Sequence, residues 1–76
     1  MLIVARQGFR QRVARCGYSM RGLAKAAGLA RESATRLAHG RPVRASTAQK
    51  LCEVLGLDFD DLFLIVEEDE HGKNVP

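Results

Sequence analysis

The sequence has few aromatic residues and no long apolar run. It holds no tryptophan, one tyrosine and three phenylalanines in 76 residues, so leucine, valine and alanine must supply most of the core. No run approaches the roughly 18 apolar residues of a membrane span. No basic and apolar leader with a small-residue cleavage site is present. We therefore expect one small cytoplasmic domain without a membrane partner.

Cysteine is almost as scarce, because Cys16 and Cys52 are the only two. They are isolated and form no CxxC pair, which argues against a zinc site. Both fall near the ends of apolar helix faces, so we expect buried, reduced thiols that act as small hydrophobes. A disulfide is the alternative, although a reducing cytosol disfavours it.

The residue inventory also excludes an enzyme. No nucleophile and base stand at a recognisable spacing, and no glycine-rich phosphate loop follows a strand. No cluster of metal ligands exists, and a chain this short has little room for a pocket. We expect no catalytic residues, no metal and no cofactor.

Charge is distributed very unevenly along the chain. Residues 1 to 50 hold eleven arginines or lysines and a single acid, Glu32, for a net charge of +10. Residues 51 to 76 hold one lysine and eight acids, for a net charge of −7. Such a block could simply be a solvated basic face, but arginine also suits phosphates and guanine edges. The N-terminal block is therefore a candidate nucleic-acid surface.

Residues 17 to 40 show the spacing of two short helices joined by a turn. Gly17, Gly28 and Gly40 each stand where a helix would end, in the left-handed conformation that glycine tolerates. Apolar residues between them recur at intervals of three and four, which places them on one face of each helix. The stretch predicts a helix-turn-helix, although an ordinary helical hairpin would show the same spacing.

The wider pattern resembles the phage-repressor and Cro-like (XRE-type) helix-turn-helix family. The residues that carry the resemblance within the motif are Gly17, Ser19, Leu23, Ala24, Gly28, Leu29 and Gly40. The match continues to the Asp61-Leu62-Phe63 segment, so that it covers about residues 9 to 63. The resemblance implies an all-α, compact five-helix repressor-like domain that binds duplex DNA.

We expect this domain to span residues 1–66, with an acidic, flexible tail over 67–76. The expected helices run from about 8 to 15, from Ser19, from 31 to 39, from 45 to 55 and from 59 to 63. Ser19 is the expected N-cap of the second helix, and Asp58 and Asp61 open the fifth with a capping box. Residues 1–5 read as a strand that pairs with Leu64-Ile65-Val66, either within the chain or between subunits.

In a helix-turn-helix, the second helix of the motif enters the major groove. The resemblance therefore implies base contacts from this helix, and the candidates are Arg31, Glu32, Ser33, Thr35 and Arg36. An arginine here could grip guanine bidentately. Glu32 could accept from cytosine, or it could orient Arg36 at i+4.

Phosphate contacts are expected from residues on either side of that helix. The resemblance and the position of each residue at a helix end or in a loop give the candidates Ser19, Met20, Arg21, His39, Arg41 and Arg44. Met20 stands where many relatives carry glutamine. His39 could instead cap the third helix.

Two functions fit these expectations. The first is a sequence-specific transcriptional regulator, a Cro-like repressor of phage or mobile-element type. The second is an antitoxin, which binds a toxin as a protein partner and also binds its own promoter. A homodimer through Leu62, Phe63, Leu64, Ile65 and Val66 is one interpretation of the apolar C-terminal run. The same residues could equally belong to the core or to the intramolecular strand.

Overall fold

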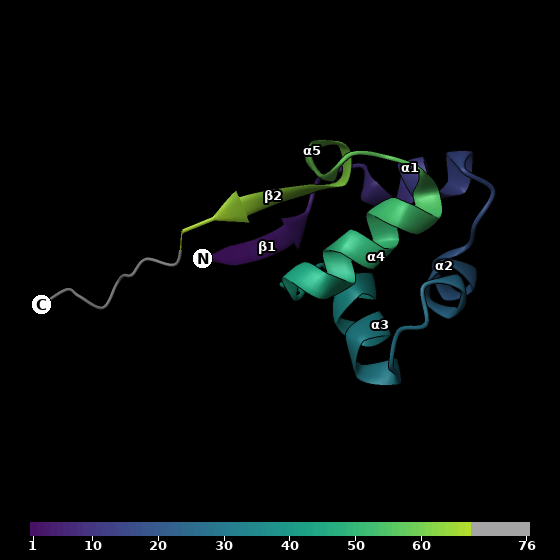
Figure 1. The fold of residues 1–76 in the computed structure, drawn as a ribbon, viewed down its shortest axis with the longest axis horizontal. Coiled ribbons are helices and arrows are strands. Elements are labelled where there is room, and N and C mark those ends of the chain that lie inside the picture. The colour runs from purple at the N-terminus through teal and green to yellow at the C-terminus, as the bar shows by residue number, and fades with distance from the viewer. Residues whose placement is uncertain (68–76) are drawn as a thin grey trace, which may run out of the picture.

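The computed structural model describes residues 1–67, which form five helices and a two-stranded ribbon (Figure 1). In chain order the elements are β1 (Leu2–Ala5), α1 (Phe9–Arg15), α2 (Met20–Ala26), α3 (Arg31–Ala38), α4 (Ala45–Leu55), α5 (Phe59–Leu62) and β2 (Phe63–Val66). The predicted five-helix domain with a short ribbon is confirmed. Among these residues, no helix has the length and apolar character that crossing a membrane requires.

The two helix caps predicted at Ser19 and at Asp58 are confirmed by hydrogen bonds. The backbone N–H of Gly22 donates to the hydroxyl oxygen of Ser19 at 3.0 Å, so Ser19 is the N-cap of α2. A Cβ at Gly22 would lie 3.1 Å from the same oxygen, which gives a reason for glycine inside this helix. At α5, the N–H of Asp58 donates to a carboxylate oxygen of Asp61 at 3.2 Å.

The predicted glycine turns are also present. Gly17, Gly28 and Gly40 have φ angles of 90°, 69° and 70°, in the left-handed region, and each directly follows the C-cap residue of a helix. These turns fix where α1, α2 and α3 end and how the next segment leaves.

The core is built mainly from aliphatic residues, with Phe9 and Phe63 as its buried aromatic side chains. Its largest fully buried members are Phe63, Leu23, Leu51, Leu62 and Val13. The ring of Phe63 lies between those of Phe9 and Phe59, with both centroid distances 5.6 Å. Phe63 comes from β2, Phe9 from α1 and Phe59 from α5, so this aromatic cluster joins three elements.

The ribbon brings the two ends of the described chain together. β1 and β2 pair antiparallel, with Leu2 opposite Val66 and Ala5 opposite Phe63. The strand pairing that we left open is therefore formed within the chain. The N–H of Val43, in the loop after α3, donates to the oxygen of Ile3 at 2.9 Å, so the free side of β1 is fastened to that loop.

Three expectations need correction or fall outside the structure. Cys16 is exposed rather than buried, because it follows the last turn of α1, while Cys52 is partly buried; both thiols are free. Leu62 and Phe63 are completely buried in the core, so neither is accessible to a second subunit. The predicted acidic tail, apart from Glu67, lies outside the described residues.

The two thiols should differ in reactivity. Burial raises the pKa of Cys52, and the nearby carboxylates of Asp58, Asp61 and Glu53 raise that pKa further. Because the thiolate is the reactive form, we expect iodoacetamide at mildly alkaline pH to modify Cys16 well before Cys52. Peptide mass spectrometry over a time course would measure both rates, and faster labelling of Cys52 would contradict the burial described here.

Candidate nucleic-acid interface

The turn between α2 and α3 sets the angle of the exposed helix. Leu23 and Ala24 bury the inner face of α2, and Leu29 in the turn packs against the core. The N–H of Leu29 donates to the oxygen of Ala24 at 2.9 Å, which holds the turn against the end of α2. On α3 only Leu37 is fully buried, so most of this helix projects from the body of the domain (Figure 1).

The outward side of α3 carries most of the residues predicted to read bases. Arg31, Glu32, Thr35, Arg36 and His39 are all exposed and, together with Arg41, line one continuous groove. The guanidinium of Arg36 and the carboxylate of Glu32 are 3.6 Å apart, one helical turn from each other. Both are well exposed, so this pair adds little stability. Its geometry matches the interpretation that Glu32 orients Arg36.

His39 occupies the C-cap position of α3. Its Nδ1 lies 2.9 Å from the carbonyl oxygen of Thr35, and the carbonyl can only accept, so Nδ1 carries the hydrogen. The same carbonyl also accepts the backbone N–H of His39 at 3.1 Å, so the ring adds a second bond to it at the helix end, in line with the capping alternative. The same ring lines the groove on the outer side of α3, so capping leaves it near any bound phosphate.

Ser33 lies on the side of α3 that faces the start of α4. It is half-buried and lines a mostly polar groove between α3 and the start of α4. The same groove is lined by Arg36, Arg44, Ser46 and Lys50. Sequence reasoning missed Ser46 and Lys50, although their spacing of four residues on a predicted helix placed both on one face of that helix. This cluster of hydroxyl and cationic groups suits a phosphate.

The predicted phosphate contacts divide into two groups. Arg21, Arg41 and Arg44 are exposed around the motif and free to reach a DNA backbone. At the start of α2, the hydroxyl of Ser19 accepts the capping bond but still has a hydrogen to donate. Met20 packs partly against the core, so its contribution could only be its backbone N–H in the first turn of α2.

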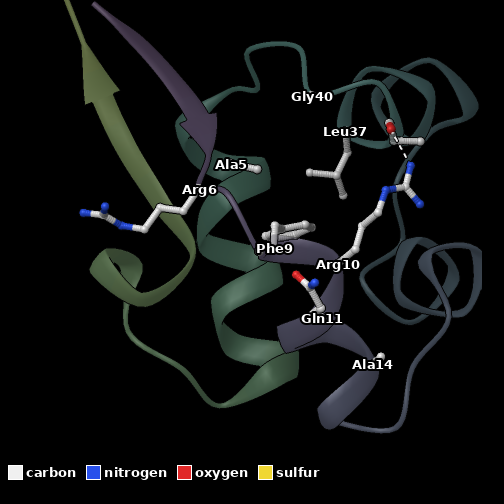
Figure 2. Close-up of a pocket in the computed structure, with 10 residues that line it drawn as sticks. Ala5, Arg6, Phe9, Arg10, Gln11, Ala14, Leu37 and Gly40 are labelled. Atoms are coloured by element: carbon white, nitrogen blue, oxygen red, sulfur yellow. Dashed lines mark hydrogen bonds between the residues drawn. The ribbon is translucent and has the colours of Figure 1, made fainter.

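Arg10 was not predicted to take part, yet it connects α1 to the end of α3. Its Nη2 donates to the carbonyl oxygen of Ala38, the last residue of α3, at 2.6 Å (Figure 2). The side chain runs along a pocket between the two helices, with Phe9 and Leu37 among its lining residues (Figure 2). A cation at a helix C-terminus also interacts favourably with the helix dipole. Arg10 therefore helps to hold α3 in place.

Replacing Arg10 by alanine should loosen this end of α3. We expect a loss of about 1 kcal/mol in the free energy of unfolding, or a fall in melting temperature of roughly 4–8 °C for a domain of this size. Differential scanning calorimetry would measure it. Arg12→Ala is the matched control, because Arg12 lines only a groove formed by α1 and the loop before it. Equal effects of the two changes would show that the bond to Ala38 carries no stability.

Nothing in the described residues points to a metal. Among residues 1–67, no three histidine, cysteine, aspartate or glutamate side chains are grouped closely enough to hold an ion. The grooves around α3 are open and lined by cations, hydroxyls and one ion pair, which suits an extended anionic partner better than a small molecule in an enclosed site.

The exposed helix α3 follows a glycine turn and has cations on either side, which is the arrangement of a helix-turn-helix DNA-binding domain. The profile of the Cro/C1-type HTH DNA-binding domain matches residues 9–68 of the 76-residue chain. The protein therefore belongs to the Cro/C1-type helix-turn-helix family of DNA-binding regulators, which is not a family of enzymes. No curated protein and no solved structure matches the chain.

Proposed function

We propose that the protein is a sequence-specific regulator that reads the major groove of duplex DNA with α3. The observation that carries this proposal is the exposed row of Arg31, Glu32, Thr35 and Arg36 along one side of that helix. Side chains near the start of such a helix reach base edges when it lies in the groove. Arginine can bond guanine bidentately, and the Thr35 methyl can contact thymine.

The flanking cations would fix the register of α3 on the duplex. Arg21 stands in the first turn of α2, while Arg41 and Arg44 follow α3 in the loop that leads to α4. Contacts of this kind position a protein and set the salt dependence of binding, but they carry little sequence information. Lys50 and Ser46, beside Arg44, extend this phosphate-binding side onto α4.

We further propose that binding represses transcription, with the protein acting in the cytoplasm as a Cro-like repressor of phage or mobile-element type. The family membership and the basic surface around α3 support this proposal. An antitoxin would use the same helix for its own promoter and would in addition need a toxin partner. We also propose that the regulator acts as a homodimer, through the exposed part of the C-terminal run at Ile65 and Val66.

Selection from a library of random duplexes, followed by sequencing of the bound sites at two salt concentrations, tests the proposed function. We expect an enriched site and an affinity that falls steeply with salt, because the logarithm of the binding constant decreases by about 0.9 per neutralised phosphate for each tenfold rise in salt. Salt-sensitive binding without an enriched sequence would overturn specific recognition. Absence of binding at low salt would overturn the DNA-binding proposal altogether.

A further inference from the structure

A buried hydroxyl group in the groove between α3 and the start of α4 has no partner. It belongs to Thr47, which is 7% exposed and is the only buried polar side chain among residues 1–67. Thr47 lines this groove together with Ser33 and Ser46. Its hydroxyl takes part in no hydrogen bond with another of the described residues. Because an unpaired buried hydroxyl destabilises a fold, Thr47 points to a ligand that would pair with it.

The first turn of α4 adds unpaired backbone donors beside the same groove. Arg44 is the N-cap of α4 and forms no side-chain capping bond, and no acidic residue stands in the first turn. Ala48 is the first residue whose N–H reaches a helical carbonyl, the oxygen of Arg44, at 3.0 Å. Within residues 1–67, the N–H groups of Ala45, Ser46 and Thr47 have no acceptor. The start of this 11-residue helix therefore offers donors and the positive end of its dipole to an anion.

The charge and size of the groove suit a small dianion. Arg36, Arg44 and Lys50 line it against a single acid, Glu32, whose carboxylate lies 3.6 Å from the guanidinium of Arg36. The net charge of +2 balances a phosphate monoester, which carries about −1.5 to −2 at neutral pH. The groove has a volume of about 370 Å³, within the usual range of small-molecule sites. In Figure 1 the start of α4 lies beside α3.

We propose that this groove binds the terminal phosphate of a small phosphorylated molecule. The hydroxyl groups of Thr47, Ser33 and Ser46 would donate to its oxygens, and Lys50 and Arg44 would neutralise its charge. A phosphate of duplex DNA carries a sugar on each side, so it can touch the exposed arginines but cannot bring an oxygen down to the buried Thr47. A terminal phosphate has three free oxygens and only one substituent, so it can reach this hydroxyl.

A ligand in this groove should weaken the binding of DNA. Arg36 lines both this groove and the outer groove of α3, and Arg44 is among the proposed phosphate contacts. A bound dianion would cancel the charge that these arginines offer to the duplex. By linkage, DNA would weaken the binding of the ligand by the same factor. This consequence rests on the proposed function, whereas the site itself does not.

A titration without DNA tests the site. We would add monoethyl phosphate to isotopically labelled protein and follow the backbone amides by heteronuclear NMR, with diethyl phosphate as the matched diester. We expect the monoester to cause saturable shifts at Ser46 and Thr47, and the diester to cause little change. Thr47→Val should weaken binding about tenfold or more, because it removes a hydrogen bond to a charged group. Thr47→Ser keeps the hydroxyl and should retain binding.

Two controls make the result specific to this groove. Lys50→Ala and Lys25→Ala each remove one exposed lysine from a helix, but only Lys50 lines the groove, so only Lys50→Ala should weaken binding. Thr47→Val should also keep or raise the melting temperature, since it replaces an unpaired hydroxyl by a methyl group. Equal binding by Thr47→Val and the unmodified chain, equal binding of monoester and diester, or a lower melting temperature of Thr47→Val would each overturn the proposal.

A second titration includes the selected duplex and tests the effect on DNA binding. Monoethyl phosphate should weaken duplex binding about fivefold more than sodium chloride of the same ionic strength does, and Thr47→Val should remove this difference. An unchanged DNA affinity with the ligand bound would overturn the regulatory effect. Because the first titration contains no DNA, its failure would leave the proposed function standing. Failure to bind any duplex would in turn leave the phosphate site standing.

Discussion

Removing both arginines from α3 should abolish the preference of this protein for its DNA site. Arg31 and Arg36 are exposed on the side of α3 that is free of the core, and no buried contact depends on either. Each bidentate contact with guanine is worth about 1–3 kcal/mol, so each single alanine variant should bind its site about 5- to 150-fold more weakly. Titration of labelled duplex with the selected site and with a scrambled one would measure the preference.

Two further variants make this result specific to base reading. Arg44→Ala should weaken binding to both duplexes by a similar factor and lower the salt slope by about one, as loss of a phosphate contact does. Arg12→Ala removes the same charge from α1 and should leave the preference unchanged. If the double variant at Arg31 and Arg36 retained the full preference, α3 would not be the reading element.

Truncation of Phe63 should unfold most of the protein. Phe63 is completely buried and its ring contacts Phe9 and Phe59, so alanine would leave a cavity at the junction of α1, α5 and β2. Phenylalanine-to-alanine changes in cores cost about 3–5 kcal/mol, and a domain of this size has about that much stability in total. Urea titration followed by circular dichroism at 222 nm would show the loss.

Ile65→Ala is the matched control for this change. Ile65 lies on the same strand and on the same face of the ribbon as Phe63, but it is half exposed. Its truncation should change the free energy of unfolding by about 0.5 kcal/mol or less at concentrations where the protein is monomeric. A stable, cooperatively folded Phe63→Ala variant would contradict the central place of the aromatic cluster.

The helices were predictable because local signals agreed with one another. Ser19 precedes an apolar face with helical spacing, and Gly28 and Gly40 end their helices in the left-handed region. Physical rules for caps, turns and periodicity act over only a few residues, so one sequence suffices to apply them. The pairing of β1 with β2 was predicted only as one of two alternatives, because strand propensity does not say which chain supplies the partner.

Features that depend on distant residues could not be read from the sequence. The bond from Arg10 to Ala38 joins residues that spacing does not relate, and it needs the packing angle of α1 against α3. Cys16 was expected to continue the buried stripe of α1, but the helix ends before it. Met20 and Ser33 were assigned to DNA by position alone, and the fold turns both partly toward other helices.

The ribbon also has a consequence for how the chain reaches its folded state. Leu2 pairs with Val66, and Leu62 and Phe63 complete the core. The first strand therefore cannot pair before the last strand has been synthesised. Such distant pairings are slow to form because most of the chain must be brought together first. During translation, α1 to α4 can form while β2 is still inside the ribosome, but the core stays open. The protein should become able to bind DNA only after Val66 has left the exit tunnel.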